Sequence, residues 1–227
     1  MMEIMYSIVG FFAGGGAFMY PILLVAAFGT AIGVERYVTL TRLGVKNRSA
    51  WAQLEPALRN GDFDKAREMT NQDDTAISRL LGMGLARQGA VRRREDVEIA
   101  MEESMMEIIP QLEKRTHYLA TFANLATLLG LLGTVSGLIH AFAAVATVNP
   151  AEKANLLSAS ISEAMNCTAF GLMTAVPIVF VHALLQTKTT ELINSLETAS
   201  VKFLNAMTDR QPSRAQSRLG LAQAVNQ

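Results

Sequence analysis

Residues 118–148 read YLATFANLATLLGLLGTVSGLIHAFAAVATV, and these 31 residues contain no Asp, Glu, Lys or Arg. Two further stretches share this property: residues 4–34, which number 31, and residues 164–187, which number 24. A bilayer core of about 30 Å is crossed by about 20 helical residues. A helix in a soluble core keeps a polar face, and none of the three stretches shows one. The sequence therefore predicts an all-α membrane protein with three transmembrane helices.

The composition agrees with a membrane protein and points away from several other classes. Charged residues make up 18% of the chain, against about 25% in an ordinary soluble domain. The net charge of zero gives no sign of a nucleic-acid surface. Cys167 is the single cysteine, which excludes an intrachain disulfide and offers no cluster of metal ligands. We predict no enzyme, no metal and no cofactor.

The distribution of Lys and Arg predicts the orientation in the membrane. Residues 35–117 carry fourteen of them and residues 188–227 carry five, whereas residues 1–14 carry none and residues 149–163 carry only Lys153. Positively charged loops stay in the cytoplasm. The chain is therefore predicted to lie in the cell inner membrane, with a periplasmic N-terminus and a cytoplasmic C-terminus. The N-terminus has no basic segment before its apolar run, so we expect no signal peptide and a retained first span.

Residues 50–88 are predicted to form short helices separated by turns. The Asn60-Gly61-Asp62 stretch predicts a break, and Asp73-Asp74-Thr75 is a candidate cap for the next helix. After Gly89 the spacing predicts one long helix that continues into span two, with Pro110 as a possible kink. The Asn149-Pro150-Ala151-Glu152 stretch predicts the start of a helix that runs through span three to about Met207.

These signals give long cytoplasmic helical extensions below the membrane. The predicted division is an N-terminal interfacial segment (1–16), transmembrane helix 1 (17–34), a cytoplasmic helical region (35–117), transmembrane helix 2 (118–148), a periplasmic turn (149–160), transmembrane helix 3 (161–187), a cytoplasmic helical extension (188–210) and a disordered tail (211–227).

Small and hydroxyl-bearing residues form one stripe on each of the last two spans. Their spacing of three and four residues places each set on one helical face. Small residues let helices approach closely, and Thr hydroxyls either bond across such an interface or line a polar path. Both interpretations, helix packing and a pore wall, remain open for these residues. The stripes are Thr127, Gly130, Thr134, Gly137 and Ala141 in span two, and Ala164, Thr168, Gly171 and Ala175 in span three.

Glu163 is the acidic residue nearest to the stripes, one helical turn before Thr168. An ionisable group at membrane depth is costly and is a functional candidate by default. The alternative is that Glu163 marks the outer interface, where water solvates its carboxylate. No span contains a mid-membrane Asp or Lys. If protons are conducted, we therefore expect another chain to supply the titrating carboxylate.

Several motifs resemble the MotA/TolQ/ExbB proton-channel family. The run from Gly130 to Leu138 resembles its second-span motif, and the run from Glu163 to Leu172, followed by Ala175-Val176-Pro177, resembles its third-span motif. Glu35-Arg36 and the stretch from Ala57 to Asp62 are also similar. The three predicted spans are similar to those of the ExbB/TolQ branch.

This resemblance implies a homopentamer around a central pore that holds a dimer of an ExbD/TolR-like single-span partner. The partner's membrane Asp would carry the proton, which is the coupling ion, and a TonB- or TolA-like protein would receive the work. Thr134 and Thr168 match the family's pore threonines, and Glu163 matches its third-span glutamate. We expect a proton channel that drives TonB-dependent transport. The alternatives are a motor for TolQ-like envelope maintenance or surface motility, and a non-conducting membrane scaffold.

Overall fold

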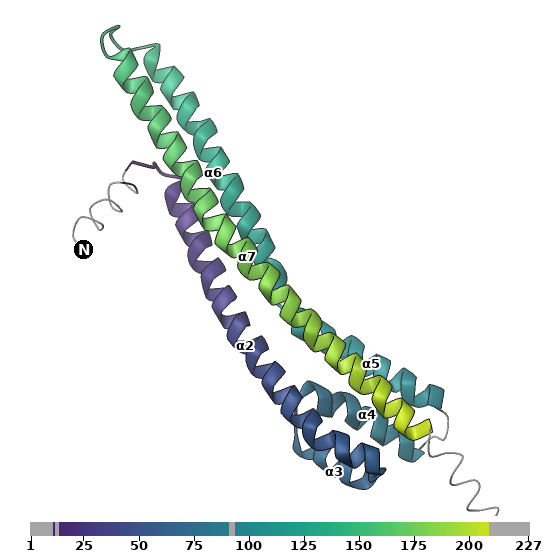
Figure 1. Cartoon of the computed structure of the whole chain (residues 1–227). Helices are drawn as coiled ribbons and strands as arrows, with labels where there is room; N and C mark the ends of the chain where they lie inside the picture. The colour runs from purple at the N-terminus through teal and green to yellow at the C-terminus, as the bar shows by residue number, and fades with distance from the viewer. Residues whose placement is uncertain (1–10, 12–13, 91–93, 209–227) are drawn as a thin grey trace, which may run out of the picture. The chain divides into compact units, whose positions relative to one another are not determined.

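The computed structural model describes residues 11, 14–90 and 94–208, and its regular secondary structure in this part of the chain is α-helical. Most of the predicted interfacial segment and all of the tail at 211–227 lie outside the described residues. Three helical stretches are long and apolar enough to cross a membrane, Met19–Asn60, Arg94–Val145 and Lys153–Thr208, in agreement with the three predicted spans. In chain order the helices are α2 (Met19–Asn60), α3 (Phe63–Gln72), α4 (Ala76–Ala90), α5 (Arg94–Glu113), α6 (Thr116–Val145) and α7 (Lys153–Thr208) (Figure 1).

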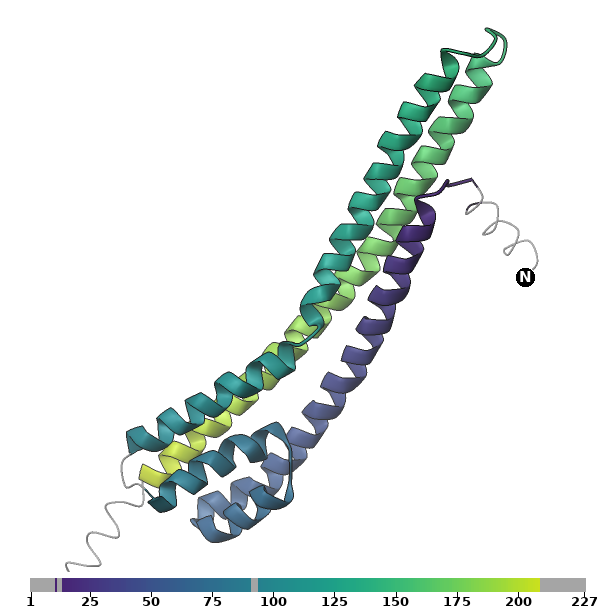
Figure 2. The ribbon, with the colours of Figure 1, turned by 180° about the vertical axis from the view of Figure 1, so that it is seen from behind.

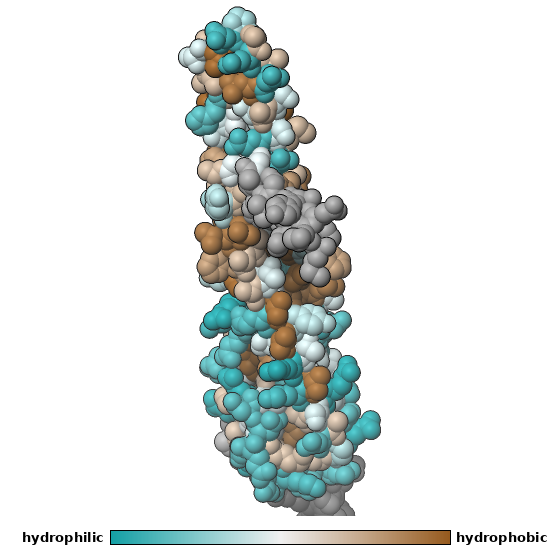
Figure 3. Space-filling model, turned by 90° about the vertical axis from the view of Figure 1, so that its left-hand side faces the viewer, coloured by the Kyte–Doolittle hydropathy of each residue, from teal (hydrophilic) through white to brown (hydrophobic). Residues whose placement is uncertain are grey.

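The chain divides into two compact units. The apolar unit consists of Met1–Tyr37 and Arg115–Gln186, and the polar unit consists of Val38–Lys114 and Thr187–Gln227. Large hydrophobic side chains of the apolar unit point outward, for example Leu24, Leu128 and Phe180, which are 61%, 60% and 65% exposed. Figure 3 shows hydrophobic side chains gathered on the apolar unit toward the middle of the molecule, a mixed surface at the tip of the α6–α7 hairpin, and mostly hydrophilic side chains on the polar unit. So much exposed apolar surface fits a lipid environment.

In the apolar unit, α6 and α7 form an antiparallel hairpin and lie side by side in both Figure 1 and Figure 2. The helix α2 packs beside α7, where two glycines keep the helices close. A Cβ atom on Gly29 would lie 2.6 Å from Cδ1 of Ile178, and one on Gly33 would lie 3.1 Å from Cγ1 of Val181. The sequence therefore places glycines where α2 approaches a branched side chain of α7.

In the polar unit, the predicted turns are confirmed at both ends of α3. The helix α2 ends at Asn60, and Gly61 takes a φ of +71°, a conformation that favours glycine. Asp62 caps α3 by accepting a hydrogen bond from the backbone N–H of Lys65 at 3.2 Å. Thr75 caps α4 by accepting one from the backbone N–H of Ser78 at 3.3 Å.

The core of the polar unit is closed by large apolar side chains. Leu80, Leu81 and Leu85 of α4 are fully buried, as are Met101 of α5 and Phe203 of α7. This packing explains why α4 and α5, which are short, hold their positions beside the long helices.

Two predictions about helix continuity are wrong. The short helices expected from residue 50 onward begin only after Asn60, because α2 continues through Pro56 as one helix of 42 residues. The long helix expected to run into span two is interrupted at Lys114 and Arg115, between α5 and α6. Arg115 takes a φ of +66°, so the break is a left-handed residue, and Pro110 stays inside α5.

The predicted start of the helix that contains the third span is also displaced. The helix α7 begins at Lys153, and residues 149–152 form a turn in which the backbone N–H of Glu152 donates to the carbonyl of Asn149 at 3.0 Å. The capping pattern therefore marks a turn just before the helix. The structure describes α7 as far as Thr208, so the predicted end of this helix at about Met207 stays a prediction.

Candidate functional site

The two predicted stripes face each other within one chain. A Cβ atom on Gly171 would lie 2.7 Å from the carbonyl oxygen of Ala126 and 3.0 Å from Cα of Gly130. A Cβ atom on Gly130 would lie 3.3 Å from Cα of Gly171. Both glycines are buried. The helices α6 and α7 therefore approach each other backbone to backbone at this point, which only residues without a side chain allow.

The same close packing continues along the hairpin. A Cβ atom on Gly137 would lie 2.9 Å from Cβ of Ala164, and Ala164 is buried. Ala141 and Ala175 are also buried. Within one copy these residues serve helix packing, which was one of the two interpretations of the stripes. That they also border a pore stays a prediction, since a pore would form between copies.

Thr168 links the two helices by a hydrogen bond. Its hydroxyl donates to the carbonyl oxygen of Gly130 at 2.8 Å, and the side chain is partly buried. Because the carbonyl oxygen of Gly130 belongs to α6, this bond holds the Thr168 hydroxyl at the contact between the two helices. Thr168 therefore reaches a polar atom of α6 at the depth of the close glycine contact.

Thr134 and Thr127 bond within their own helix. The hydroxyl of Thr134 donates to the carbonyl of Leu131 at 2.6 Å, and that of Thr127 donates to the carbonyl of Ala123 at 3.1 Å. Thr134 is partly exposed and Thr127 is exposed. These threonines lie at the border of the α6–α7 contact, where a neighbouring chain or water can reach their oxygens.

Thr134 and Thr168 lie on the side of the hairpin that faces away from α2. On α6, a Cβ atom on Gly133 would meet Cys167 of α7 and would lie 3.6 Å from Cβ of Phe18, just before α2. Thr134 is turned about 100° from Gly133. On α7, Val181 faces Gly33 of α2, and Thr168 is turned about 140° from Val181 by the same helical spacing. The hairpin thus brings the two predicted pathway hydroxyls to one side.

Glu163 lies on the other side, beside the residues that precede α2. Its carboxylate packs against Gly16, so closely that a Cβ atom there would overlap Oε1 of Glu163, and Gly16 takes a φ of +72°. One turn further along α7, the side-chain amide of Asn166 donates to the carbonyl of Gly14 at 3.3 Å. Glu163 itself is exposed. The structure therefore does not bring Glu163 together with Thr134 and Thr168 within one copy.

A polar cluster at the start of α6 was missed by the sequence reasoning. Arg115 forms an ion pair with Glu35 at 3.0 Å, donating to both carboxylate oxygens. Beside it, Nε of the buried Arg36 donates to the hydroxyl of Thr116 at 3.4 Å. These contacts join α2 to the break before α6. The Glu35-Arg36 pair is visible in the sequence. The sequence does not show that Arg115 and Thr116 are the partners of this pair.

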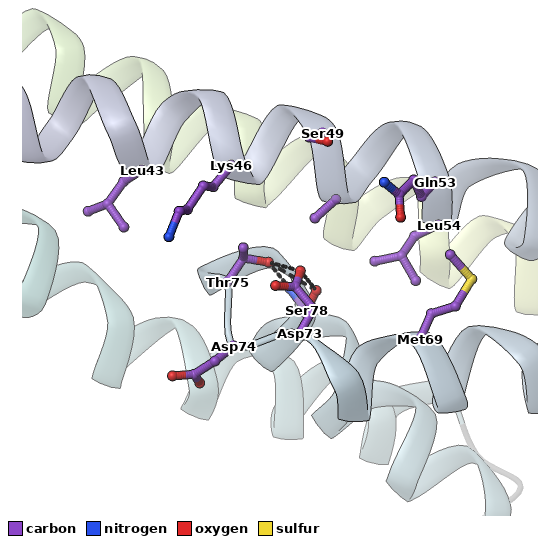
Figure 4. Close-up of a pocket in the computed structure, with 11 residues that line it drawn as sticks. Leu43, Lys46, Ser49, Gln53, Leu54, Met69, Asp73, Asp74, Thr75 and Ser78 are labelled. Atoms are coloured by element: carbon purple, nitrogen blue, oxygen red, sulfur yellow. Dashed lines mark hydrogen bonds between the residues drawn. The ribbon is translucent and has the colours of Figure 1, made fainter.

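The polar unit contains a cavity of about 530 Å³ between α2 and the α3–α4 turn. Figure 4 shows Lys46 pointing into it from α2, opposite Thr75 and Asp74. The carboxylate of Asp73 accepts hydrogen bonds from the hydroxyls of Thr75 at 2.7 Å and Ser78 at 2.8 Å. These polar groups therefore stabilise the turn that forms one wall of the cavity. Its lining residues are Leu43, Lys46, Ser49, Ala50, Gln53, Leu54, Met69, Asp73, Asp74, Thr75 and Ser78.

Comparison with known proteins identifies the family. The model of the MotA/TolQ/ExbB proton channel family matches residues 72–198, more than half of the chain, including most of α6 and α7. The chain belongs to the MotA/TolQ/ExbB proton channel family. The resemblance seen in the motifs is therefore confirmed, and so is its assignment to the ExbB/TolQ branch, since the relatives carry those names.

The individual relatives of this MotA/TolQ/ExbB family member include proteins named for the Tol-Pal system and proteins named for ExbB biopolymer transport. The chain is 34% identical over 109 residues to the Tol-Pal system protein TolQ of Haemophilus influenzae, covering 48% of the chain and 46% of that protein. It is 29% identical over 171 residues to the putative biopolymer transport protein ExbB-like 1 of Synechocystis, covering 73% and 65%. It is 26% identical over 147 residues to the biopolymer transport protein ExbB of Pseudomonas putida, covering 62% and 44%. The match thus spans about half to two thirds of these relatives.

Proposed function

We propose that this chain is the proton-channel subunit of an inner-membrane motor that couples the proton motive force to TonB-dependent transport across the outer membrane. The observation that carries the proposal is the pair of hydroxyls, Thr134 and Thr168, on the side of the α6–α7 hairpin that faces away from α2. Membership in a proton-channel family supports it. In this proposal the hydroxyls guide protons or hold the partner's carboxylate in a region without charged side chains of its own.

The α6–α7 hairpin has no acidic side chain at mid-membrane depth, and this defines the role that we propose for the chain. Residues 118–148 and 164–187 contain no Asp or Glu, so the α6–α7 hairpin has no acidic proton carrier at mid-membrane depth. An ExbD/TolR-like single-span partner dimer would supply an Asp inside a pore formed by five copies of this chain. A TonB-like protein would receive the mechanical work. The names of the ExbB relatives support this assignment of partners.

The proposed placement follows the charges. With the fourteen Lys and Arg of residues 35–117 in the cytoplasm, the polar unit lies in the cytoplasm and the N-terminus and the α6–α7 turn lie in the periplasm. The exposed apolar side chains of α2, α6 and α7 then face membrane lipids or neighbouring copies.

Envelope maintenance is the second candidate, because two of the relatives are named Tol-Pal system protein TolQ, at 34% and 28% identity. Deletion of the gene separates the candidates. Loss of uptake of large iron complexes with an intact envelope supports TonB-dependent transport, and leakage of periplasmic proteins supports the Tol-Pal role. The close packing of Gly130 and Gly171 would also serve a non-conducting scaffold, which the next experiment addresses.

The proposal is tested by co-expressing the chain with its ExbD-like partner and measuring function in cells. Thr134→Val and Thr168→Val should abolish energised transport at unchanged assembly, and Glu163→Gln should reduce it. Thr30→Val is the matched control, since Thr30 is an exposed threonine of α2 in the apolar run. If the Thr134, Thr168 and Glu163 variants all behave as the parent does, the proton-pathway assignment is wrong and the scaffold gains support.

A further inference from the structure

One face of α5 in the polar unit is apolar at its centre and acidic at its rim. Ile99 and Met106 are 62% and 74% exposed, and their spacing of seven residues puts them on the same face. Glu102, Glu103 and Glu107 are exposed beside them. We call these five residues the acidic stripe.

A face of α2 in the same unit has the opposite charge. Val45 is 66% exposed, and the exposed Arg42 and Arg48, three residues before and after it, share its face. We call these three residues the basic stripe. No acidic residue occurs between Glu35 and Glu55, so the charge of this face is uniform.

In the part of the chain that the structure describes, none of the five charged side chains in the two stripes has an ion pair. By contrast, Glu55 near the end of α2 is paired with Lys202 at 3.1 Å. A large apolar side chain at the centre of an exposed, charged helix face is typical of a surface that is covered in an assembly.

We propose that the acidic stripe of one copy docks on the basic stripe of the next copy. The stripes are complementary in charge, each has an apolar centre, and along their helices they extend about 12 Å and about 9 Å. This inference rests on the proposed assembly of several copies, and it names the surfaces that join them in the polar unit.

The placement of the stripes favours a ring. In Figure 1 α5 passes behind α7, and in Figure 2, which is turned by 180°, α5 passes in front while the lower part of α2 fades behind. The two helices therefore present different surfaces of the polar unit. A contact between two different surfaces joins copies head to tail, and such contacts close into a ring when the rotation between copies permits.

Lipid headgroups are a poorer occupant of the basic stripe. Arg42 and Arg48 follow Val34, the end of the predicted first span, by eight and fourteen residues. This corresponds to about 12–21 Å of helix, whereas the headgroup layer on each side of a bilayer is about 5–8 Å thick. A helix of the adjacent copy can cover the whole stripe.

Cysteine cross-linking of the full-length chain in nanodiscs tests the contact without changing any charge. The double variant Val45→Cys, Met106→Cys should give a ladder from dimer up to the full ring with a short bismaleimide. Each single variant should give no ladder, because one cysteine has no partner in a head-to-tail contact. The parent, which keeps the buried Cys167, is the control. A dimer from either single variant, or no ladder from the double variant, overturns the proposal.

Charge reversal gives the second measurement. Replacing Glu102, Glu103 and Glu107 by Lys should lower the cross-linking yield about tenfold, since attraction becomes repulsion across the contact. Further replacement of Arg42 and Arg48 by Glu should restore the yield, provided that the variant is inserted normally. The matched control reverses Asp64, Glu68 and Glu197, which are exposed acids outside the stripe, and should leave the yield unchanged.

The outcomes separate this inference from the proposed function. If the α5 reversal leaves the cross-linking yield and the mass of the assembly unchanged while Thr134→Val still stops energised transport, the stripe contact is wrong and the channel proposal stands. If the ladder forms as expected and Thr134→Val transports normally, the contact stands and the channel proposal fails.

Discussion

Replacing Gly171 by alanine adds only one methyl group, yet it should strongly destabilise the α6–α7 hairpin. The added Cβ atom would lie 2.7 Å from the carbonyl oxygen of Ala126 and 3.0 Å from Cα of Gly130. Both are backbone atoms, which cannot turn away as a side chain can. The helices must therefore separate, which weakens the hydrogen bond from Thr168 to Gly130 as well. Overpacking costs about 1–3 kcal/mol, and the backbone contacts put this site near the upper limit.

The assay is thermal unfolding of the purified chain in detergent. A loss of about 2–3 kcal/mol corresponds to a fall of about 4–12 °C in the midpoint of unfolding for a chain of this size. Gly44→Ala is the control, because a Cβ atom there would lie 3.5 Å from Cδ2 of Leu192, an ordinary contact, and alanine favours a helix. The control should melt at or above the midpoint of the parent. An unchanged midpoint for Gly171→Ala would refute the backbone-to-backbone contact.

Three further changes test individual contacts by the same unfolding measurement. Thr168→Val should lower the free energy of unfolding by about 1 kcal/mol because it removes the interhelical hydrogen bond, and Thr168→Ser should keep most of the stability. Equal unfolding midpoints for the Val and Ser variants would contradict this hydrogen bond. Arg115→Gly should be about 1 kcal/mol more stable than Arg115→Ala, because both lose the ion pair with Glu35 but only glycine tolerates the φ of +66° freely. Asp62→Ala should cost about 1 kcal/mol by removing the cap of α3, with Asp62→Asn nearly neutral; if both lose equally, the cap is not the cause.

The spans and the turns of the polar unit could be predicted from the sequence. Long stretches without charge have few structural solutions, so residues 118–148 and 164–187 had to be helical in a membrane. Asn60-Gly61-Asp62 and Thr75 act locally, through a left-handed glycine and through side chains that cap the next helix. Local signals of this kind need no knowledge of the rest of the fold.

The break between α5 and α6 could not be predicted, because its cause is not local. Arg115 is left-handed although it is neither Gly nor Asn. Its ion pair reaches Glu35, eighty residues earlier, and the adjacent Thr116 bonds to Arg36. A sequence shows neither the proximity of α2 nor the stabilisation that this contact provides.

The stripes were found, but their spacing could not distinguish helix packing from a pore wall. Residues at intervals of three and four share a face whichever partner they meet. The structure separates the stripe into buried residues, such as Gly130 and Gly171, and border residues, such as Thr127 and Thr134. It also separates Glu163 from Thr168, because they are five residues apart on α7 and lie on different sides of the hairpin.

The most direct test of the central claim is a measurement of proton flux. The chain and its single-span partner are reconstituted in liposomes with a pH-sensitive dye inside, and a membrane potential is applied. We predict acidification of the liposomes that requires both chains, that is lost in Thr134→Val and Thr168→Val at unchanged assembly, and that persists in Thr30→Val. Flux no greater than that of empty liposomes, or flux unaffected by the two threonine variants, would contradict a proton path along this hairpin.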